Sequence, residues 1–434
     1  MAHYAIVCPD EAGHLLSVGA VGKELMRRGH RVTVIGRALA ASVVQQLDLP
    51  LHELDASGVR YPFTPISWVA FGSVGALWLV VIRNELRRYA EQVLRLVPQA
   101  LRALEVDGVL VDQTVPAGGT AAEHAGIPFV TVCSALLWNR EPDIPPSFTV
   151  WPMAHDRRTR LRNQLAHAGF DWFVGPIRRK INRYRAAWKL PPIRRLGDFD
   201  SPLAQVSQLC PGFDFPRTQL PDTFHYVGSL AVERKGTAEN PFPWEKLDGR
   251  PLIFASLGTV AFPANLANLP VYRKIAAACG GLDAQLVLAL GRWDKSSLDL
   301  RHKLGPLPGN PLVVEFAPQL AILDRASLLV THAGVNTVLE AISRGVPMVA
   351  LPRSADQPGM AARIEYSGVG LRASFRHCTV DELRRLIQRV LAEDVFRRRV
   401  RELQTVMVAA GGAARAAEIA EEAFSTRRPV RQKR

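Results

Sequence analysis

The segment that decides the fold is FAPQLAILDRASLLVTHAGVNTVLEAISRGVPMVALPRSADQ, residues Phe316–Gln357. Its apolar run Leu328–Thr331 predicts a buried strand, and the spacing of apolar residues after it predicts a helix over Val335–Arg344. A glycine and a proline end that helix, and Met348–Leu351 predicts the next strand. This strand–helix–strand order is typical of a βαβ unit in a parallel sheet.

The turn before the helix carries polar residues at the carboxyl end of a strand, where open α/β sheets bind ligands. The backbone N–H groups from Gly334 to Thr337 would have no partner within the helix and would point out of its positive end. That geometry suits a pyrophosphate. The segment contains no GxGxxG and no P-loop, because no Lys-Ser/Thr pair follows its glycine.

Short motifs follow one another in order along this segment. They are Ala317-Pro318-Gln319, Thr331-His332-Ala333-Gly334, Asn336-Thr337, Glu340-Ala341, Gly345-Val346-Pro347 and Asp356-Gln357. Together they resemble the nucleotide-sugar signature of the UDP-glycosyltransferase superfamily. The run Asp356–Gly359 followed by Ala361–Arg363 is most similar to the bacterial zeaxanthin (carotenoid) glucosyltransferase branch. The signature spans roughly a tenth of the chain, and its ordered spacing makes it more specific than a lone motif.

Length and composition agree with a large globular enzyme. The 434 residues, 48% of them hydrophobic, are enough for two or three domains with substantial cores. The five cysteines lie far apart and form no CxxC, which favours a reducing, cytoplasmic location. The N-terminus enters a predicted strand at Tyr4–Val7 without the features of a signal peptide.

The net charge of +14 is concentrated in two places. Residues Trp151–Gly197 hold twelve Lys and Arg against two Asp, and the tail Arg427–Arg434 adds five more positive charges. The first region interleaves its charges with aromatic residues, so it is a solvated helical face, a nucleic-acid platform or an interfacial membrane helix pair. The charges and aromatic neighbours of Arg178–Lys189 favour an anionic membrane surface as partner, not nucleic acid. This region also resembles the membrane-facing patch of glycosyltransferases with lipid acceptors.

The N-terminal half also alternates strands and helices. Strands are predicted at Arg31–Gly36, Gly108–Asp112 and Pro128–Cys133, and helices at Val18–Arg28 and Ala117–Ala125. Such alternation predicts an α/β protein with a parallel sheet covered by helices on both faces. Between these elements, the run from Ile66 to Ile82 carries no charge, and we interpret it as a buried helix or the wall of an apolar cleft.

The resemblance implies two doubly wound, Rossmann-like domains that face each other across a cleft, the GT-B arrangement. We expect an acceptor-binding domain over residues 1–230, a linker over 231–250, a nucleotide-sugar domain over 251–410, a helix over 411–426 that returns to the first domain, and a basic tail over 427–434. The linker is rich in glycine and proline, and strands after it are predicted at Leu252–Ser256, Gln285–Ala289 and Leu312–Glu315.

Two polar residues of the N-terminal half are candidates for catalysis. His14 follows the first strand and Asp112 ends another, so both can meet at one rim of the sheet. A histidine base can take the proton of an acceptor hydroxyl, and a carboxylate can orient the imidazole and stabilise the imidazolium. The resemblance implies the same roles. Asp107 precedes its strand and should lie at the opposite rim.

The resemblance also implies which residues hold the donor. Gln319 and the backbone near Phe316 and Pro318 would hold the base, and the phenylalanine leaves uracil or thymine open. Glu340 would accept the ribose hydroxyls, and Asp356 and Gln357 would bind the sugar. The remaining candidates would surround the diphosphate: Ser256, Gly258, Thr259, His332, Gly334, Asn336 and Thr337.

The expected reaction is the inverting transfer of a sugar, with glucose as first choice, from a UDP-sugar to a hydrophobic alcohol. The UDP-sugar is a co-substrate, and we expect neither a metal nor another cofactor. The pair Asp198 and Asp200 has the spacing of a metal-binding DxD motif, but it follows a basic helix, so we expect a turn.

The preferred acceptor is a hydroxylated carotenoid such as zeaxanthin. We expect the protein to be peripheral on the inner face of the membrane. The alternatives are a soluble polyketide or macrolide acceptor, a nucleotide-sugar epimerase and a nucleic-acid-binding protein. The last leaves the segment around His332 unexplained.

Overall fold

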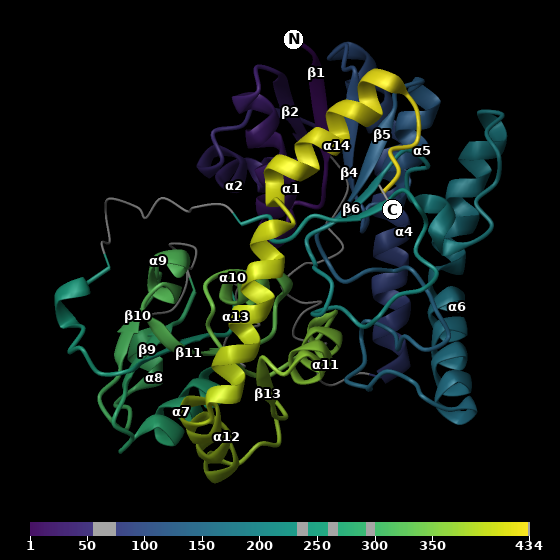
Figure 1. Cartoon of the computed structure of the whole chain (residues 1–434). Coiled ribbons are helices and arrows are strands. Elements are labelled where there is room, and N and C mark those ends of the chain that lie inside the picture. Colours follow the sequence, from purple (N-terminus) through teal and green to yellow (C-terminus); the bar gives the residue numbers. More distant parts are fainter. Residues whose placement is uncertain (55–74, 232–241, 259–267, 292–299, 433–434) are drawn as a thin grey trace.

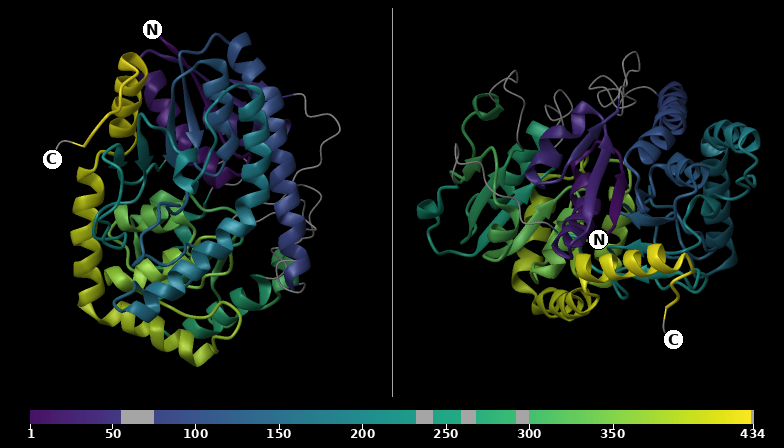
Figure 2. Two further views of the ribbon diagram at one scale, coloured as in Figure 1. Left: turned by 90° about the vertical axis from the view of Figure 1, so that its right-hand side faces the viewer. Right: turned by 90° about the horizontal axis from the view of Figure 1, so that it is seen from above.

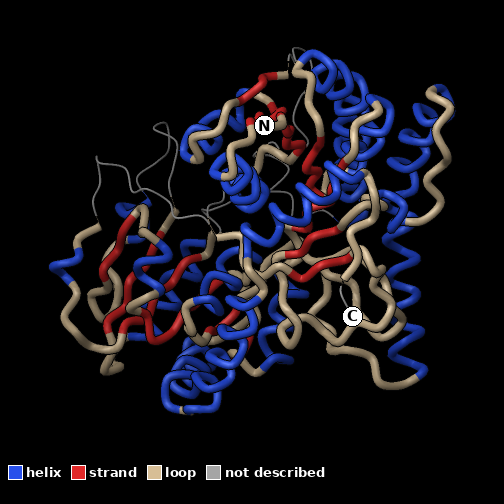
Figure 3. The backbone as a smooth tube through the Cα atoms, turned by 45° about the horizontal axis from the view of Figure 1, so that its top comes forward, coloured by secondary structure: helices blue, strands red, loops and turns tan. Residues whose placement is uncertain are grey.

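The computed structural model describes residues 1–54, 75–231, 242–258, 268–291 and 300–432. Two parallel sheets, each with its own covering helices, form two lobes (Figures 1 and 3). Every strand pairing in the described part of the chain is parallel. The predicted α/β class with two doubly wound parallel sheets is therefore confirmed.

The first lobe contains a seven-stranded sheet of order β3-β2-β1-β4-β5-β6-β7. Its strands are β1 (His3–Val7), β2 (Arg31–Gly36), β3 (Leu51–Glu53), β4 (Gly108–Asp112), β5 (Phe129–Cys133), β6 (Gln205–Ser207) and β7 (Phe224–Tyr226). Its helices are α1 (Ala12–Arg27), α2 (Ala41–Gln46), α4 (Gly75–Ala103), α5 (Pro116–Ala125) and α6 (Arg157–Ala187), with short 3₁₀ turns at Ala38–Ala40 and Leu196–Phe199.

The second lobe contains a six-stranded sheet of order β10-β9-β8-β11-β12-β13. Its strands are β8 (Leu252–Ser256), β9 (Gln285–Ala289), β10 (Leu312–Val314), β11 (Ala326–Thr331), β12 (Met348–Ala350) and β13 (Gly370–Arg372). Its helices are α7 (Leu269–Cys279), α8 (Leu300–Leu304), α9 (Gln319–Leu323), α10 (Val335–Ser343), α11 (Gln357–Ser367), α12 (Val380–Ala392) and α13 (Asp394–Ala409). A 3₁₀ turn at Trp244–Lys246 precedes β8.

Each sheet has one point where the strand order reverses, between β1 and β4 in the first and between β8 and β11 in the second. At such a point the loops on the two sides diverge and leave room for a ligand. Register aligns the ends of these strands, since Val7 is opposite Val111 and Ser256 is opposite Thr331. A ligand site is therefore expected at the loops after these four strands.

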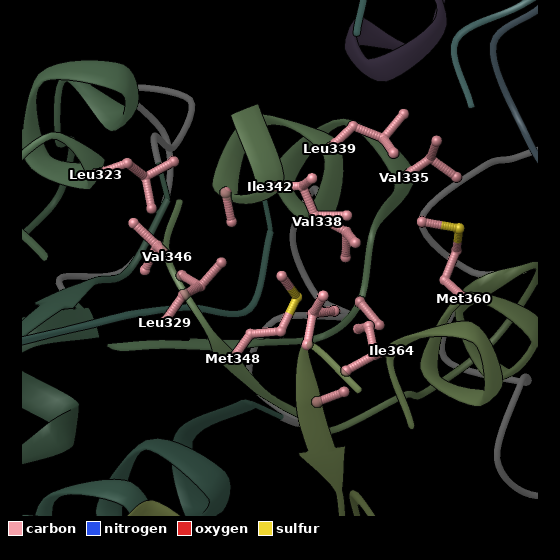
Figure 4. Close-up of a cluster of buried hydrophobic side chains, with 14 of the residues drawn as sticks. Leu323, Leu329, Val335, Val338, Leu339, Ile342, Val346, Met348, Met360 and Ile364 are labelled. Carbon is pink, nitrogen blue, oxygen red and sulfur yellow. The ribbon is translucent and has the colours of Figure 1, made fainter. Parts of the chain in front are cut away.

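The core beneath the second reversal point is a close-packed apolar cluster (Figure 4). Val338 and Ile342 of α10 face Met348 of β12, and Ile364 of α11 belongs to the same cluster. All four side chains are fully buried. Burying a side chain of this size contributes about 1.5–3 kcal/mol, so this packing holds α10 and α11 rigidly over the sheet.

The last helix, α14 (Gly412–Thr426), leaves the second lobe and packs on the first (Figures 1 and 2). Its Phe424 ring lies 5.0 Å from the ring of Tyr4, and its Glu421 pairs with Arg28 at 3.0 Å. Gly108 leaves room for the phenylalanine, because a Cβ there would lie 2.5 Å from the ring. The chain thus crosses between the lobes near its C-terminal end.

One helix starts earlier than predicted, and part of one expected element lies outside the described residues. Helix α1 begins at Ala12 and not at Val18, so Gly13 lies in its first turn and does not break it. Of the uncharged run 66–82, residues 66–74 lie outside the described residues, and the remainder begins α4.

The five cysteines are all free and buried. Within the ranges that the structure describes, no helix is long and apolar enough to cross a membrane.

Candidate active site

His14 and Asp112 meet at the rim where the first sheet reverses its strand order. His14 lies in the first turn of α1, and Asp112 is the last residue of β4. The imidazole Nδ1 is 3.1 Å from a carboxylate oxygen of Asp112. Asp112 is fully buried, whereas the His14 side chain is 26% exposed. The imidazole can therefore be reached from outside while its acidic partner cannot.

Two hydroxyl residues that the sequence did not single out hold this pair. Thr114 donates to one carboxylate oxygen of Asp112 through its backbone N–H (2.8 Å) and its hydroxyl (2.5 Å). Ser134, which follows β5, donates to the other oxygen, and its hydroxyl is 2.7 Å from His14 Nδ1. The carboxylate is thus fixed by donors on both oxygens.

The pair is electrically coupled. Burial lowers the pKa of His14, but the charge and hydrogen bond of Asp112, with Glu11 and Asp356 nearby, raise it to about 9. Burial raises the pKa of Asp112, but His14 and the two hydroxyls outweigh that effect and lower it. The resting state at neutral pH is therefore an imidazolium–carboxylate pair.

The second lobe presents the N-terminus of α10 at its own reversal point. Ala333, in the turn after β11, has the positive φ of 65° that favours glycine, so the turn is strained. The first helical hydrogen bond runs from Val338 N to Gly334 O, at 3.0 Å. The N–H groups before Val338 therefore point out of the positive end of the helix.

The imidazole of His332 lies between two glycines of this rim. A Cβ atom at either Gly258 or Gly334 would lie 2.8 Å from its Cε1 atom, so a side chain at either position would displace the ring. Burial lowers the pKa of His332 to about 4, with Arg353 acting in the same direction. His332 is therefore neutral at pH 7 and can offer one N–H as a donor.

Gln319, Thr337 and Glu340 come together on one side of this helix. The amide of Gln319 donates to the carboxylate of the buried Glu340 and lies 3.3 Å from the Thr337 hydroxyl. The structure thus groups three predicted donor residues from α9 and α10. Pro318 directly precedes α9, and Phe316 lies two residues before Pro318. Ser256 ends β8, while Thr259 lies outside the described residues.

Asn336 joins the two lobes. Its amide nitrogen donates to the carbonyl of Gly13 (2.7 Å), the residue before His14. Its amide oxygen accepts from the Ser17 hydroxyl of α1 (2.9 Å) and from Gln208 after β6 (3.0 Å). The sequence predicted only the backbone of Asn336 as a binding group. The side chain places the end of α10 against the helix that carries His14.

Asp356 and Gln357 stand at the N-terminus of α11. A carboxylate oxygen of Asp356 accepts from the backbone N–H of Leu136 in the first lobe, at 3.1 Å. The side-chain oxygen of Gln357 accepts from the N–H groups of Arg353 (2.9 Å) and Ser354 (3.1 Å). Its amide NH₂ group is therefore the part that can donate to a sugar hydroxyl.

The DxD-like pair is a structural turn, as expected. Asp198 accepts from the backbone N–H groups of Arg194 (2.8 Å) and Arg195 (2.9 Å) and so closes the 3₁₀ turn. Burial raises the pKa of Asp200 to about 7. Among the described residues, no three His, Cys, Asp or Glu side chains are grouped so that they could hold a metal ion.

Comparisons with known proteins agree with this geometry. The model of the family "UDP-glucoronosyl and UDP-glucosyl transferase" matches residues 90–408. The chain is 36% identical over 432 residues to a zeaxanthin glucosyltransferase of Pantoea ananas, covering 99% of this chain and 98% of that one. It is 34% identical over 429 residues to a zeaxanthin glucosyltransferase of Pseudescherichia vulneris, covering 98% of each. The fold is similar to the crystal structure of the glycotransferase of kitacinnamycin, with a TM-score of 0.72, 23% identity, and coverage of 98% and 99%.

Proposed function

Because this chain belongs to the UDP-glucoronosyl and UDP-glucosyl transferase family and is a glycosyltransferase, we propose that it transfers glucose from UDP-glucose to a hydroxyl of a hydroxylated carotenoid. The observation that carries the proposal is the meeting of His14–Asp112 with the N-terminus of α10 through Asn336. A direct sugar transfer needs two parts: a base that takes the proton of the acceptor hydroxyl, and a helix N-terminus that binds the leaving diphosphate.

The base is neutral His14. It takes the proton of the acceptor hydroxyl while that oxygen attacks the anomeric carbon from the face opposite the diphosphate, so the configuration inverts. Asp112 stabilises the imidazolium that forms and holds the ring in one orientation. Because the resting imidazole is protonated, the enzyme must release that proton before each attack.

The leaving diphosphate would lie at the N-terminus of α10. The backbone N–H groups there and the N–H of His332 would offset its growing negative charge, so we propose no resident metal. Glu340 would accept the ribose hydroxyls and Gln319 would hold the uracil. Asp356 and Gln357 would hold the sugar hydroxyls, with the Gln357 NH₂ group as donor.

The acceptor assignment is supported by the likeness to the two zeaxanthin glucosyltransferases over nearly the whole chain. The test is to incubate the protein with radiolabelled UDP-glucose and, in separate reactions, zeaxanthin in vesicles, a soluble macrolide and no acceptor. We expect labelled carotenoid glucoside. Label only on the macrolide would overturn the acceptor, and interconversion of the free sugar nucleotide without acceptor would indicate an epimerase.

Replacing Glu340 with alanine should weaken the binding of UDP-glucose by about 10- to 100-fold, because a charged acceptor of hydrogen bonds is lost. Calorimetric titration measures this directly. Glu340→Gln keeps the shape and one acceptor oxygen, so it should lie between the wild type and the alanine variant. An unchanged dissociation constant in Glu340→Ala would remove Glu340 from the donor site.

A membrane-facing surface is supported by helix α6, which lies at the outer edge of the first lobe (Figures 1 and 2). Leu161, Leu165 and Trp172 are 55%, 65% and 67% exposed, and their spacing places them on one face of the helix. Arg157 and Arg179, both exposed, flank this stripe on the same face. An apolar stripe between basic residues is typical of a helix that lies on anionic lipid.

We therefore expect the protein to float with vesicles that contain phosphatidylglycerol at low salt, and to be released by high salt. The double variant Leu165→Glu/Trp172→Glu should lose most of this binding. The matched control is Val408→Glu, at another 65%-exposed apolar residue, on α13. Wild-type protein that stays unbound at low salt, or equal losses in both variants, would contradict this surface.

A further inference from the structure

Helix α11 belongs to the second sheet, yet one face of it is buried against the first lobe. The backbone N–H of Gly359 donates to the carbonyl of Ser147, at 2.9 Å. A Cβ atom at position 359 would lie 2.7 Å from a methyl group of Leu136, so only glycine permits this approach. Ala362 on the same helix packs with Phe215 and Ile144 of the first lobe.

Arg363 makes the charged contact on this face. Its side chain is 2% exposed, and its Nε donates to Asp214 Oδ1 at 2.7 Å. Its Nη1 donates to the carbonyl of Gly359 at 3.0 Å, and the guanidinium lies over the Phe215 ring, 4.5 Å from its centroid. The guanidinium is thus fixed by an ion pair, its own helix and an aromatic face.

The partner carboxylate is equally well fixed within the first lobe. Asp214 lies between β6 and β7 and is 1% exposed. Its second oxygen accepts from Arg217 Nε (3.0 Å) and from the Tyr226 hydroxyl (2.9 Å). Burial raises the pKa of Asp214, but Arg363 and Arg217 outweigh this and lower it. The ion pair between Arg363 and Asp214 is therefore charged and shielded from water, and further hydrogen bonds fix both side chains.

A buried ion pair is weak evidence for stability, because removing two charges from water costs about as much as their attraction returns. What such a pair defines well is geometry, since the planar fork of arginine accepts few arrangements. Here the pair joins two lobes that carry different halves of the site. The base His14 is on one, and the sugar-binding Asp356 and Gln357 are on the other, at the start of the helix that Arg363 anchors.

We propose that Arg363 is a positioning residue that, through Asp214, seats α11 on the first lobe and so sets the place of the donor sugar relative to His14. This rests on the proposed function. The nucleotide half of the donor would be held by Gln319 and Glu340 of the second lobe, which α11 does not carry. Loss of the pair should therefore leave UDP binding intact and misplace the sugar.

The experiment compares Arg363→Met, Arg363→Lys and the control Arg185→Met. Arg185 is also a buried arginine, 5% exposed and bonded to Glu123 and Thr120, but both partners lie in the first lobe. For each variant we would measure kcat, the melting temperature, and the affinities for UDP and for UDP-glucose by calorimetry.

In Arg363→Met we expect kcat to fall about 10- to 100-fold, because a misplacement near 1 Å costs that much. UDP affinity should stay within about threefold of wild type, while the affinity gained from the glucose moiety disappears. Arg363→Lys should recover part of both effects. Arg185→Met should keep kcat within about twofold of wild type, even if its melting temperature falls as far as that of Arg363→Met.

Three results would overturn the inference: kcat in Arg363→Met within about twofold of wild type, equal loss of UDP and UDP-glucose affinity, or the same kcat loss in Arg185→Met. If Arg363→Met does not fold, Arg363→Lys decides by the same criteria. A wild-type protein that binds no UDP-sugar would overturn the proposed function instead. Active wild type with an unaffected Arg363→Met would overturn only the positioning role.

Discussion

Replacing His14 with alanine should lower kcat by about 10²- to 10⁴-fold, the usual contribution of a general base. An alcohol is a weak nucleophile, and the proposed base is the His14 imidazole, which lies beside Asp112. Asn336 joins this rim of the first lobe to α10, where the donor diphosphate would lie. The groups that would hold the nucleotide, among them Gln319 and Glu340, lie on the second lobe. Donor affinity should therefore change little, so the effect falls on kcat and not on the binding of UDP-glucose.

Steady-state kinetics and calorimetry on the same preparations measure the two quantities. The matched control is His124→Ala. The His124 ring is also in contact with a neighbour, stacked 3.8 Å from Trp188, but it lies in the last turn of α5, at the opposite end of this helix from the rim. The control should keep kcat within about twofold of wild type. Equal turnover in His14→Ala and wild type would rule out the base.

Most of the sheet could be predicted, because its strands are short apolar runs bounded by charged residues or glycine. Arg31–Gly36, Gly108–Asp112 and Leu252–Ser256 have the same bounds in the sequence prediction and in the structure. A strand that is buried on both faces is a continuous apolar run without alternation, so only its length has to be predicted. The end of such a strand also locates the site, because ligands bind beyond carboxyl ends.

Helix starts were less predictable. Helix α1 begins after Glu11 without a side-chain cap, and Gly13 in its first turn is a residue that usually indicates a loop. Tertiary contacts decide instead, since Leu15 and Leu16 are buried against the first sheet. His14 therefore has helical geometry and not loop geometry, although its place at the rim is the one expected.

The contacts that join the lobes could not be predicted at all. Arg363 and Asp214 are 149 residues apart, and Asn336 and Gly13 are 323 apart. A charged residue in a helical pattern is normally exposed, so Arg363 gave no signal of its burial. The sequence also gave no signal for Ser134 and Thr114, because a single hydroxyl residue after a strand is common in any loop. Proximity in the folded chain is what gives these residues a role.

Replacing Asp112 with asparagine should be nearly as damaging as losing the base, with kcat at its optimum pH falling about 10²- to 10⁴-fold. Asparagine keeps the size but carries no charge, so it cannot stabilise the imidazolium that forms as the proton moves. Its NH₂ group can also face His14 Nδ1, which would favour the wrong tautomer for a base. Kinetics over a range of pH measure the loss.

The same variant should change the pH dependence in a direction that the ion pair dictates. Only the neutral imidazole accepts a proton, and the wild-type pKa of His14 is about 9. Wild-type kcat/KM should therefore rise about tenfold per pH unit up to pH 9. Asparagine removes the negative charge that raises this pKa, while burial, which lowers it, remains. Because Glu11 and Asp356 still raise it, the acid limb should move from pH 9 towards the ordinary value of 6.5.

These two effects of Asp112 oppose each other at low pH, and this makes the test specific. Near pH 6 the carboxylate keeps nearly all of the wild-type base protonated, so the advantage of the wild type over Asp112→Asn should be at least about tenfold smaller than at pH 9. Thr114→Val, which loses one donor to Asp112 but keeps its charge, should leave the acid limb near pH 9. A wild-type advantage that is constant with pH would mean that Asp112 does not act through the charge of His14. The carboxylate would then only hold the ring in place, as a neutral amide could.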